Sequence, residues 1–122
     1  MSATPESGLG HLRVVLGEGA YIGPGRADLL EQIDRTGSIS AAGKTMGMSY
    51  KRAWGLVQAL NDGFGTPLVE SSRGGASQGG AHLTEAGRFV LEGYRAIQDK
   101  TRQAIADDVA ALRQKFDMSE RK

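Results

Sequence analysis

The sequence predicts one mainly α-helical domain that carries a small β hairpin. Four stretches place apolar residues at helical spacing. Two short strand candidates flank a loop that contains four glycines. The chain has 122 residues, 39% of them hydrophobic, which is enough for one compact core and too little for two.

The first elements form the start of this domain. Residues 1–10 are expected to be a flexible N-terminus, and the domain itself is expected over residues 11–84. HLRVVLG, residues 11–17, alternates and is β-branched, so it predicts a short strand, and EGAYIGPG after it predicts a loop. Pro24 suits a first helical turn, and the apolar spacing that follows predicts a helix over residues 24–35.

Two further helices follow in close succession. Ser38 is a suitable N-cap for the short helix ISAAGKTM, which Gly47 would end. Ser49 would cap a third helix over residues 50–61, with an apolar stripe of Ala53, Val57, Leu60 and Leu56. Two capped helices with Gly47-Met48-Ser49 between them indicate a helix-turn-helix. Trp54 lies one position from the stripe, and we expect it to seal the edge of the core rather than face a groove.

The hairpin comes next. Residues 68–71 and 81–83 are strand candidates, and SRGGASQGG between them is too rich in glycine for a core element. The order strand, three helices, strand, glycine-rich loop and strand is that of a winged helix-turn-helix. The predicted fold is therefore mainly α with a small β wing, formed by the loop at residues 73–80.

The last helix is predicted to be unusually long. Thr84 is a reasonable N-cap, and residues 85–116 contain no proline and repeat apolar residues at steps near three and four. Such a helix would span about 48 Å, which exceeds the width of a domain of this size. A helix from a second copy is the economical cover for the projecting apolar stripe, so we expect a dimerisation helix. Residues 117–122 are expected to fray.

Charge is unevenly distributed although the net charge is only +1. Residues 35–82 hold five cations and two acids, and this excess coincides with the helix-turn-helix. A hydroxyl, an aromatic ring and two cations open the third helix, where a major-groove helix meets phosphates and base edges. An ordinary helical hairpin with a solvated basic turn is the alternative. The candidate DNA-binding residues are Ser49, Tyr50, Lys51, Arg52, Lys44, Arg73 and Ser77.

The sequence gives little support for a metal site, a catalytic site or a membrane span. The chain has no cysteine, and His11 and His82 are too distant in sequence to suggest a metal pair, so no metal or cofactor is expected. No catalytic constellation or cofactor motif is recognisable, so an enzyme is not expected. No apolar run reaches the roughly 18 residues of a membrane span, and MSATPESG is unlike a signal peptide. We expect a cytoplasmic protein without a membrane partner.

The segments LLEQIDRTGSISAAGKTMGMSYKRAW and PLVESSRGGASQGGAHLTEAGRFVL carry a family resemblance. From about Leu29 to Ile97, the chain resembles the N-terminal DNA-binding domain of molybdate-responsive (ModE-type) regulators, itself related to the LysR-type winged helix. The resemblance implies a homodimeric transcription regulator that binds double-stranded DNA. It implies that residues 49–52 open the recognition helix, that residues 73–80 form the wing, and that helical residues after Glu85 help to form the dimer.

The sequence departs from this family at its C-terminal end. ModE-type regulators that sense molybdate usually carry a β-rich oxyanion-binding region, whereas this sequence ends at Lys122 in a predicted helix. We therefore expect a single-domain form without the molybdate-binding region and assign no effector residues. Two alternatives stay open, namely an oxyanion-responsive switch for molybdate or tungstate and a protein-interaction adaptor on the same scaffold.

Overall fold

The computed structural model describes residues 8–72 and 80–116. The expectations for residues 1–7, for the wing loop with Arg73 and Ser77, and for the tail lie outside these ranges. The described elements, in chain order, are β1 (Val14–Gly17), β2 (Ala20–Ile22), α1 (Pro24–Thr36), α2 (Ile39–Thr45), α3 (Tyr50–Phe64), β3 (Val69–Ser72), β4 (Gly80–Leu83) and α4 (Glu85–Lys115).

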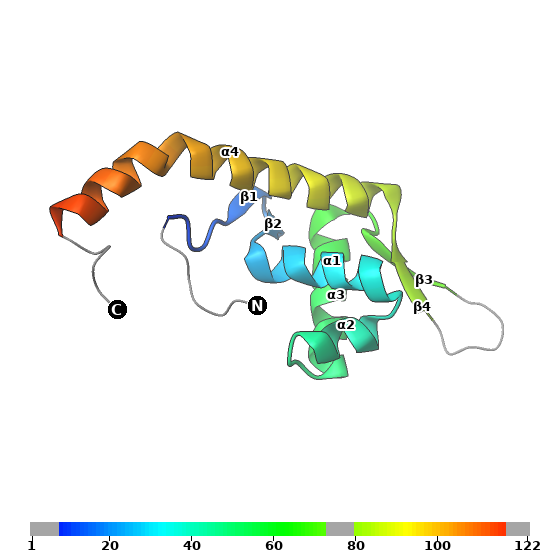
Figure 1. Cartoon of the computed structure of the whole chain (residues 1–122). Coiled ribbons are helices and arrows are strands. Elements are labelled where there is room, and N and C mark those ends of the chain that lie inside the picture. Colours follow the sequence, from blue (N-terminus) through cyan, green and yellow to red (C-terminus); the bar gives the residue numbers. More distant parts are fainter. Residues whose placement is uncertain (1–7, 73–79, 117–122) are drawn as a thin grey trace.

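The fold is the predicted one, with α1, α2 and α3 grouped together, a β3–β4 hairpin beside them and α4 across the top (Figure 1). Apolar side chains from α1, α3 and α4 meet in one core, and Leu68 closes it from the start of the hairpin. The largest fully buried side chains are Tyr94, Leu29, Leu30, Ile33, Leu60, Leu68 and Val57. Within the described ranges, no helix is both long and apolar enough to cross a membrane.

Two sequence expectations near the N-terminus need correction. The first strand begins at Val14, and the expected loop after it contains β2, which pairs antiparallel with β1. The reason is a tight turn at Glu18 and Gly19, where Gly19 adopts a φ of 78° that favours glycine and folds the chain back.

Helix α3 is longer than predicted, ending at Phe64 rather than at Asn61. Gly63 lies inside the helix and packs against the backbone of Gly19. A Cβ at residue 63 would overlap the carbonyl oxygen of Gly19, so the glycine permits a close approach between elements. Gly65 follows as the C-cap, with a left-handed φ of 71°.

Asn61 holds the base of the wing against α3. Its Oδ1 accepts hydrogen bonds from the backbone N–H groups of Leu68 (2.7 Å) and Val69 (3.2 Å). Its Nδ2 donates to the carbonyl oxygen of Val69 at 3.2 Å. On the other strand, the Ala81 N–H donates to the carbonyl oxygen of Gly37 at 2.9 Å. Both strands of the hairpin are therefore fixed to the helical part.

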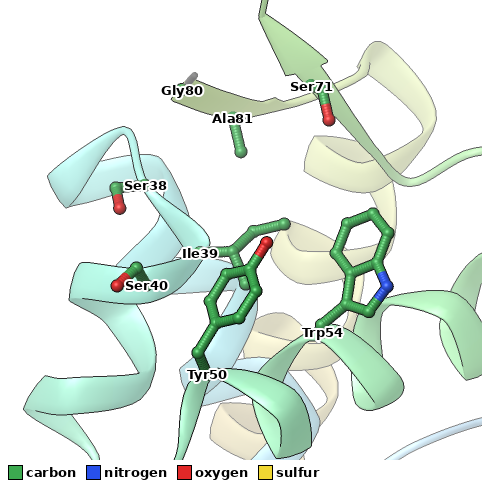
Figure 2. A pocket seen from close by; sticks show the side chains of 8 residues that line it. All are labelled: Ser38, Ile39, Ser40, Tyr50, Trp54, Ser71, Gly80 and Ala81. Atoms are coloured by element: carbon green, nitrogen blue, oxygen red, sulfur yellow. The ribbon is translucent and has the colours of Figure 1, made fainter. Parts of the chain in front are cut away.

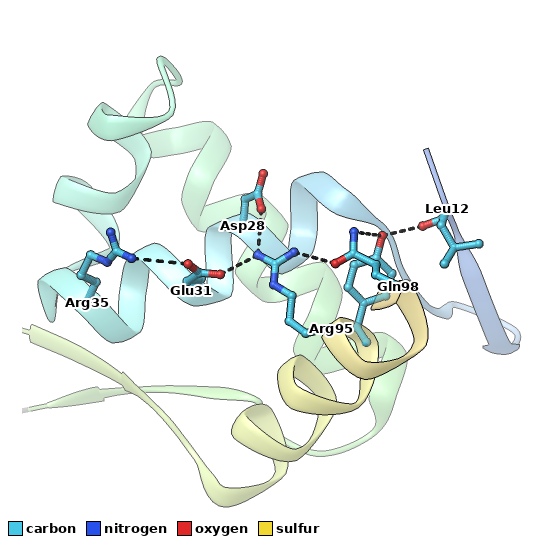
Figure 3. Close-up of polar contacts among 7 residues, drawn as sticks. Leu12, Asp28, Glu31, Arg35, Arg95 and Gln98 are labelled. Carbon is cyan, nitrogen blue, oxygen red and sulfur yellow. Dashed lines mark hydrogen bonds and ion pairs between the residues drawn. The ribbon is translucent and has the colours of Figure 1, made fainter. Parts of the chain in front are cut away.

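The N-terminal half of α4 is attached to α1 by charged groups (Figure 3). Arg95 donates to Asp28 at 2.9 Å and to Glu31 at 2.6 Å. Arg88 forms a two-point ion pair with Asp34, at 3.1 and 3.0 Å. Bidentate arginine–carboxylate pairs fix orientation as well as distance, so α4 has a defined direction relative to α1.

A buried tyrosine attaches α4 to the segment before β1. The Tyr94 hydroxyl donates to the carbonyl oxygen of Leu12 at 2.6 Å, and burial raises the pKa of this hydroxyl. The distal half of α4 extends beyond the other helices, as expected (Figure 1). Leu112 and Phe116 there are 62% and 57% exposed.

Candidate nucleic-acid interface

The helix-turn-helix begins with the two N-caps that the sequence indicated. The Ser38 hydroxyl accepts from the Ala41 N–H at 3.0 Å, and the Ser49 hydroxyl accepts from the Arg52 N–H at 3.1 Å. Each bond satisfies a donor that the first turn of a helix otherwise leaves without a partner. The caps fix where α2 and α3 start and therefore which residues occupy the first turn of α3.

The turn between α2 and α3 has the hydrogen bonds of a Schellman motif. The Met48 N–H donates to the Gly43 carbonyl at 2.9 Å, and the Gly47 N–H donates to the Lys44 carbonyl at 3.1 Å. Gly47 has a φ of 73°, the left-handed conformation that this motif requires. The sequence prediction of a glycine-ended helix followed by a second cap is thus confirmed.

Gly43 allows the two helices to pack closely. A Cβ at this position would lie 3.0 Å from the Ala53 Cβ and 3.4 Å from the Met48 carbonyl oxygen. Small residues on both helices are therefore needed at this crossing. The result is a compact unit in which α2 supports the start of α3.

The exposed face of α3 is defined by its buried one. The buried residues of this helix are Ala53, Val57 and Leu60. With 3.6 residues per turn, Lys51, Gly55, Gln58 and Asp62 lie on the opposite side, and all four are exposed. From its N-terminal to its C-terminal end, this face carries a cation, a glycine without a side chain, an amide and an acid. Arg52 lies on one flank of it and Trp54 on the other.

The expectation that Trp54 seals the edge of the core was wrong. It is 39% exposed and stacks on Tyr50, with ring centroids 6.4 Å apart and an angle of 13° between the planes. Helix rotation places Trp54 about 100° past the buried Ala53, which directs the ring toward the wing side instead of the core. Stacking on Tyr50 covers part of the apolar surface that an isolated exposed indole would leave in water.

The aromatic pair lines a small surface pocket of about 180 Å³ (Figure 2). Ser38 and Ser40 contribute hydroxyl groups from the α2 side, and Ser71 contributes one from β3. The pocket therefore joins the starts of α2 and α3 to the base of the wing. It combines apolar ring surface with polar groups that can hydrogen-bond.

The candidate cations are placed for contact with a polyanion. Lys44, Lys51 and Arg52 are all exposed, and none of them forms an ion pair with a residue in the described ranges. The acids of α1 are instead paired with α4, on a different part of the molecule. The region around the turn is thus left with unneutralised positive charge.

The structure brings most of the predicted site residues together and adds others. The start of α3 carries Ser49 as its N-cap, followed by Tyr50, Lys51 and Arg52 in its first turn. Lys44 lies in the last turn of the preceding helix, α2. Arg73 and Ser77 fall outside the described residues. Gln58 was missed by sequence reasoning, although its position seven residues after Lys51 would have placed it on the same helix face.

The structure is a winged helix-turn-helix domain of the DNA-binding type. It has the parts of such a domain, namely a short capped helix, a glycine turn, a second helix with a basic start and a supporting hairpin. Residues 26–88 match the family described as bacterial regulatory helix-turn-helix protein, lysR family. The match covers more than half of the chain, which therefore belongs to this family and confirms the LysR-type relationship.

Known relatives agree with this assignment. The chain is 49% identical over 80 residues to the molybdenum-pterin-binding protein MopB of Rhodobacter capsulatus, covering 66% of this chain and 30% of the relative. It is 39% identical over 104 residues to the transcriptional regulator ModE of Yersinia pestis, covering 83% and 40%. The chain thus spans about a third of the length of these relatives, and the predicted resemblance to ModE-type regulators is confirmed.

A solved structure gives the same result for the fold. The CbnR DNA-binding domain in complex with DNA aligns with a TM-score of 0.56 and 27% identity. The alignment covers 72% of this chain and 95% of that domain.

Proposed function

We propose that this protein is a sequence-specific regulator of transcription that binds double-stranded DNA with α3 in the major groove. The observation that supports this most is the exposed surface of residues 50–58 of α3, which carries two cations, an amide and no acid. The related CbnR domain was solved in complex with DNA. The proposed role is binding rather than catalysis, and a chromosomal DNA partner implies a cytoplasmic location.

Lys51, Gly55 and Gln58 of the exposed face each have a chemical role in this proposal. Lys51 can donate to the O6 and N7 acceptors of guanine, and Gln58 can make a two-point contact with adenine. Gly55 between them lets the helix backbone approach the base edges. Arg52, Lys44 and the N-terminus of α3 at Ser49 are suited to phosphate contacts, which supply most of the affinity.

The aromatic pocket suits the edge of the same groove. Tyr50 and Trp54 present apolar ring surface that fits a thymine methyl group or a deoxyribose. We propose the predicted wing at residues 73–80 as a further backbone contact, with Arg73 and Ser77 as its polar groups. The hydrogen bonds of Asn61 and Gly37 would fix the base of that wing relative to α3.

The first test is selection of bound sequences from a random double-stranded DNA pool with the full chain. We expect enrichment of a defined sequence. The double variant Lys51→Ala/Arg52→Ala should lose about 1–3 kcal/mol of binding free energy if a base contact is lost. For each phosphate contact that is lost, the salt slope, which is the slope of the logarithm of the binding constant against the logarithm of the salt concentration, should fall in magnitude by about one. The control Lys100→Ala/Lys115→Ala removes the same charge from α4 and should bind as the wild type does.

Two outcomes would contradict the proposal. One is a folded protein that enriches no sequence, which would favour the adaptor function on this scaffold. The other is equal affinity and equal salt slope for the α3 variant and the α4 control, which would place the DNA contact elsewhere.

We also propose that the chain forms a homodimer through the distal half of α4. The buried face of the first half carries Leu91, Tyr94 and Gln98. The same helix face continues beyond the domain with Ile105, Val109, Leu112 and Phe116. The steps of three and four residues are those of a seam between two helices, and an identical helix supplies a matching stripe. Residues 11–84 would then act as the DNA-binding unit and residues 85–116 as the dimer helix.

Leu112→Glu tests this dimer because it puts a charge at the centre of the proposed seam. Light scattering after gel filtration should give the mass of two chains for the wild type and of one chain for the variant. Ala110→Glu places the same charge about 160° around the helix and should leave the dimer intact. A wild-type monomer at all accessible concentrations would refute the dimer without affecting the DNA proposal.

A further inference from the structure

A second surface pocket lies on the flank of α3 that faces away from the wing. It has a volume of about 370 Å³ and is formed between the start of α1, the segment before β1 and the middle of α3. Its cationic lining residues are Arg13, Arg26 and Arg52, and no acid lines it. None of the three arginines forms an ion pair within the described part of the chain.

Tyr21 holds two of these arginines in place. The guanidinium carbons of Arg13 and Arg26 each lie 3.9 Å from the centroid of the Tyr21 ring. Two groups cannot occupy the same position, so the guanidinium groups stack on opposite faces of the ring. Cation–π stacking restricts both side chains without neutralising their charge. The pocket is thus organised by the protein and stays positive.

The polar groups around the pocket include donors without acceptors. Nη1 of Arg26 is buried and has no hydrogen-bond partner in the described structure. Helix α1 starts at the same place, with Gly23 as its N-cap, no side-chain cap bond and no acid in the first turn. Its first backbone N–H groups, at Gly25 and Arg26, therefore also point at this region without an acidic partner. The pocket therefore combines three arginines with a helix N-terminus, and no acid that lines it neutralises them.

We propose that this pocket binds a tetrahedral oxyanion of the phosphate class. The oxyanion has two possible sources, a phosphodiester of the DNA backbone or free phosphate in solution. Guanidinium groups and helix N–H donors match the geometry of phosphate oxygens. Because Arg52 of α3 also lines the pocket, a DNA strand that leaves the groove on this side would meet it. The DNA source rests on the function proposed above, whereas binding of free phosphate does not.

The experiment uses the full chain and the variant Arg13→Gln, which changes an exposed residue and leaves the α1 start intact. Thermal unfolding in increasing phosphate, against chloride at matched ionic strength, measures binding of the free ion. Fluorescence anisotropy with a 30-base-pair duplex at several salt concentrations measures the DNA contact. Lys100→Gln on α4 is the control of equal charge change, and circular dichroism confirms that each variant is folded.

If the oxyanion is a DNA phosphate, Arg13→Gln lowers the salt slope by about one relative to Lys100→Gln. If it is free phosphate, the wild-type midpoint rises with phosphate concentration, and the variant loses this rise while its DNA binding is unchanged. Arg26→Gln should act in the same direction in either case.

The proposal is wrong if Arg13→Gln and Arg26→Gln both match the control in both measurements. A wild type that binds no duplex at low salt would instead refute the proposed DNA function, and the phosphate titration alone would then decide this inference.

Discussion

Replacement of Asn61 by alanine tests how the wing is joined to the helical domain. Alanine would remove three hydrogen bonds, two that the side chain accepts and one that it donates. The backbone groups that lose their partner belong to Leu68 and Val69, which are both buried, so water replaces the lost bonds poorly. At about 1 kcal/mol per bond, and with Asn61 itself only partly buried, the expected loss is about 2–3 kcal/mol of unfolding free energy.

The assay is urea unfolding followed by circular dichroism at a fixed protein concentration. The midpoint should fall by about 1–2 M urea with an unchanged slope, since the slope reports the surface exposed on unfolding. Gln58→Ala is the matched control because it truncates an amide on the exposed face of the same helix, and it should cost less than about 0.5 kcal/mol. Equal midpoints for the two variants would refute the reasoning that Asn61 anchors the hairpin.

Three further substitutions test packing and turn geometry. Gly87→Ala should cost about 3 kcal/mol or more, measured by urea unfolding, because the new Cβ would overlap the carbonyl of Leu68. Gly47→Ala should lower the unfolding free energy by about 1–2 kcal/mol in the same assay, because residue 47 has a φ of 73°. Tyr94→Phe should cost about 1 kcal/mol at pH 7 through the lost bond to Leu12. Because folding raises the pKa of the Tyr94 hydroxyl, its neutral form stabilises the folded state fully below about pH 10, and this stabilisation is lost as the pH rises through the folded-state pKa. The unfolding free energy of the wild type, measured from pH 7 to 11, should therefore fall more steeply than that of the variant.

The elements were predictable because their signals are local. Ser38, Ser49 and Thr84 sit at helix starts and each accepts the expected backbone hydrogen bond. The three-residue strand β2 was missed because so short a strand has almost no periodicity, and it exists only through pairing with β1. The last three residues of α3 were missed because the sequence does not show why a glycine stands inside this helix. Gly63 is needed for the close contact with Gly19, which is distant in the sequence.

The candidate site was predictable to the same extent. The first turn of α3 follows from its cap, so residues 49–52 could be identified from sequence. The exposure of Trp54 could not, because it depends on how α2 and the hairpin leave one side of α3 open. The arrangement of Arg13 and Arg26 on Tyr21 joins three segments of the chain, and no spacing in the sequence indicates it.

The ion pairs of Arg88 and Arg95 have a consequence for the DNA that a dimer could recognise. They fix the direction of α4 relative to α1, and α4 at 31 residues is about 46 Å long. In the proposed dimer, the distance between the two copies of α3 would be set by this rigid helix rather than by a linker. The number of base pairs between the two halves of a target sequence would then depend on three salt bridges that do not contact DNA.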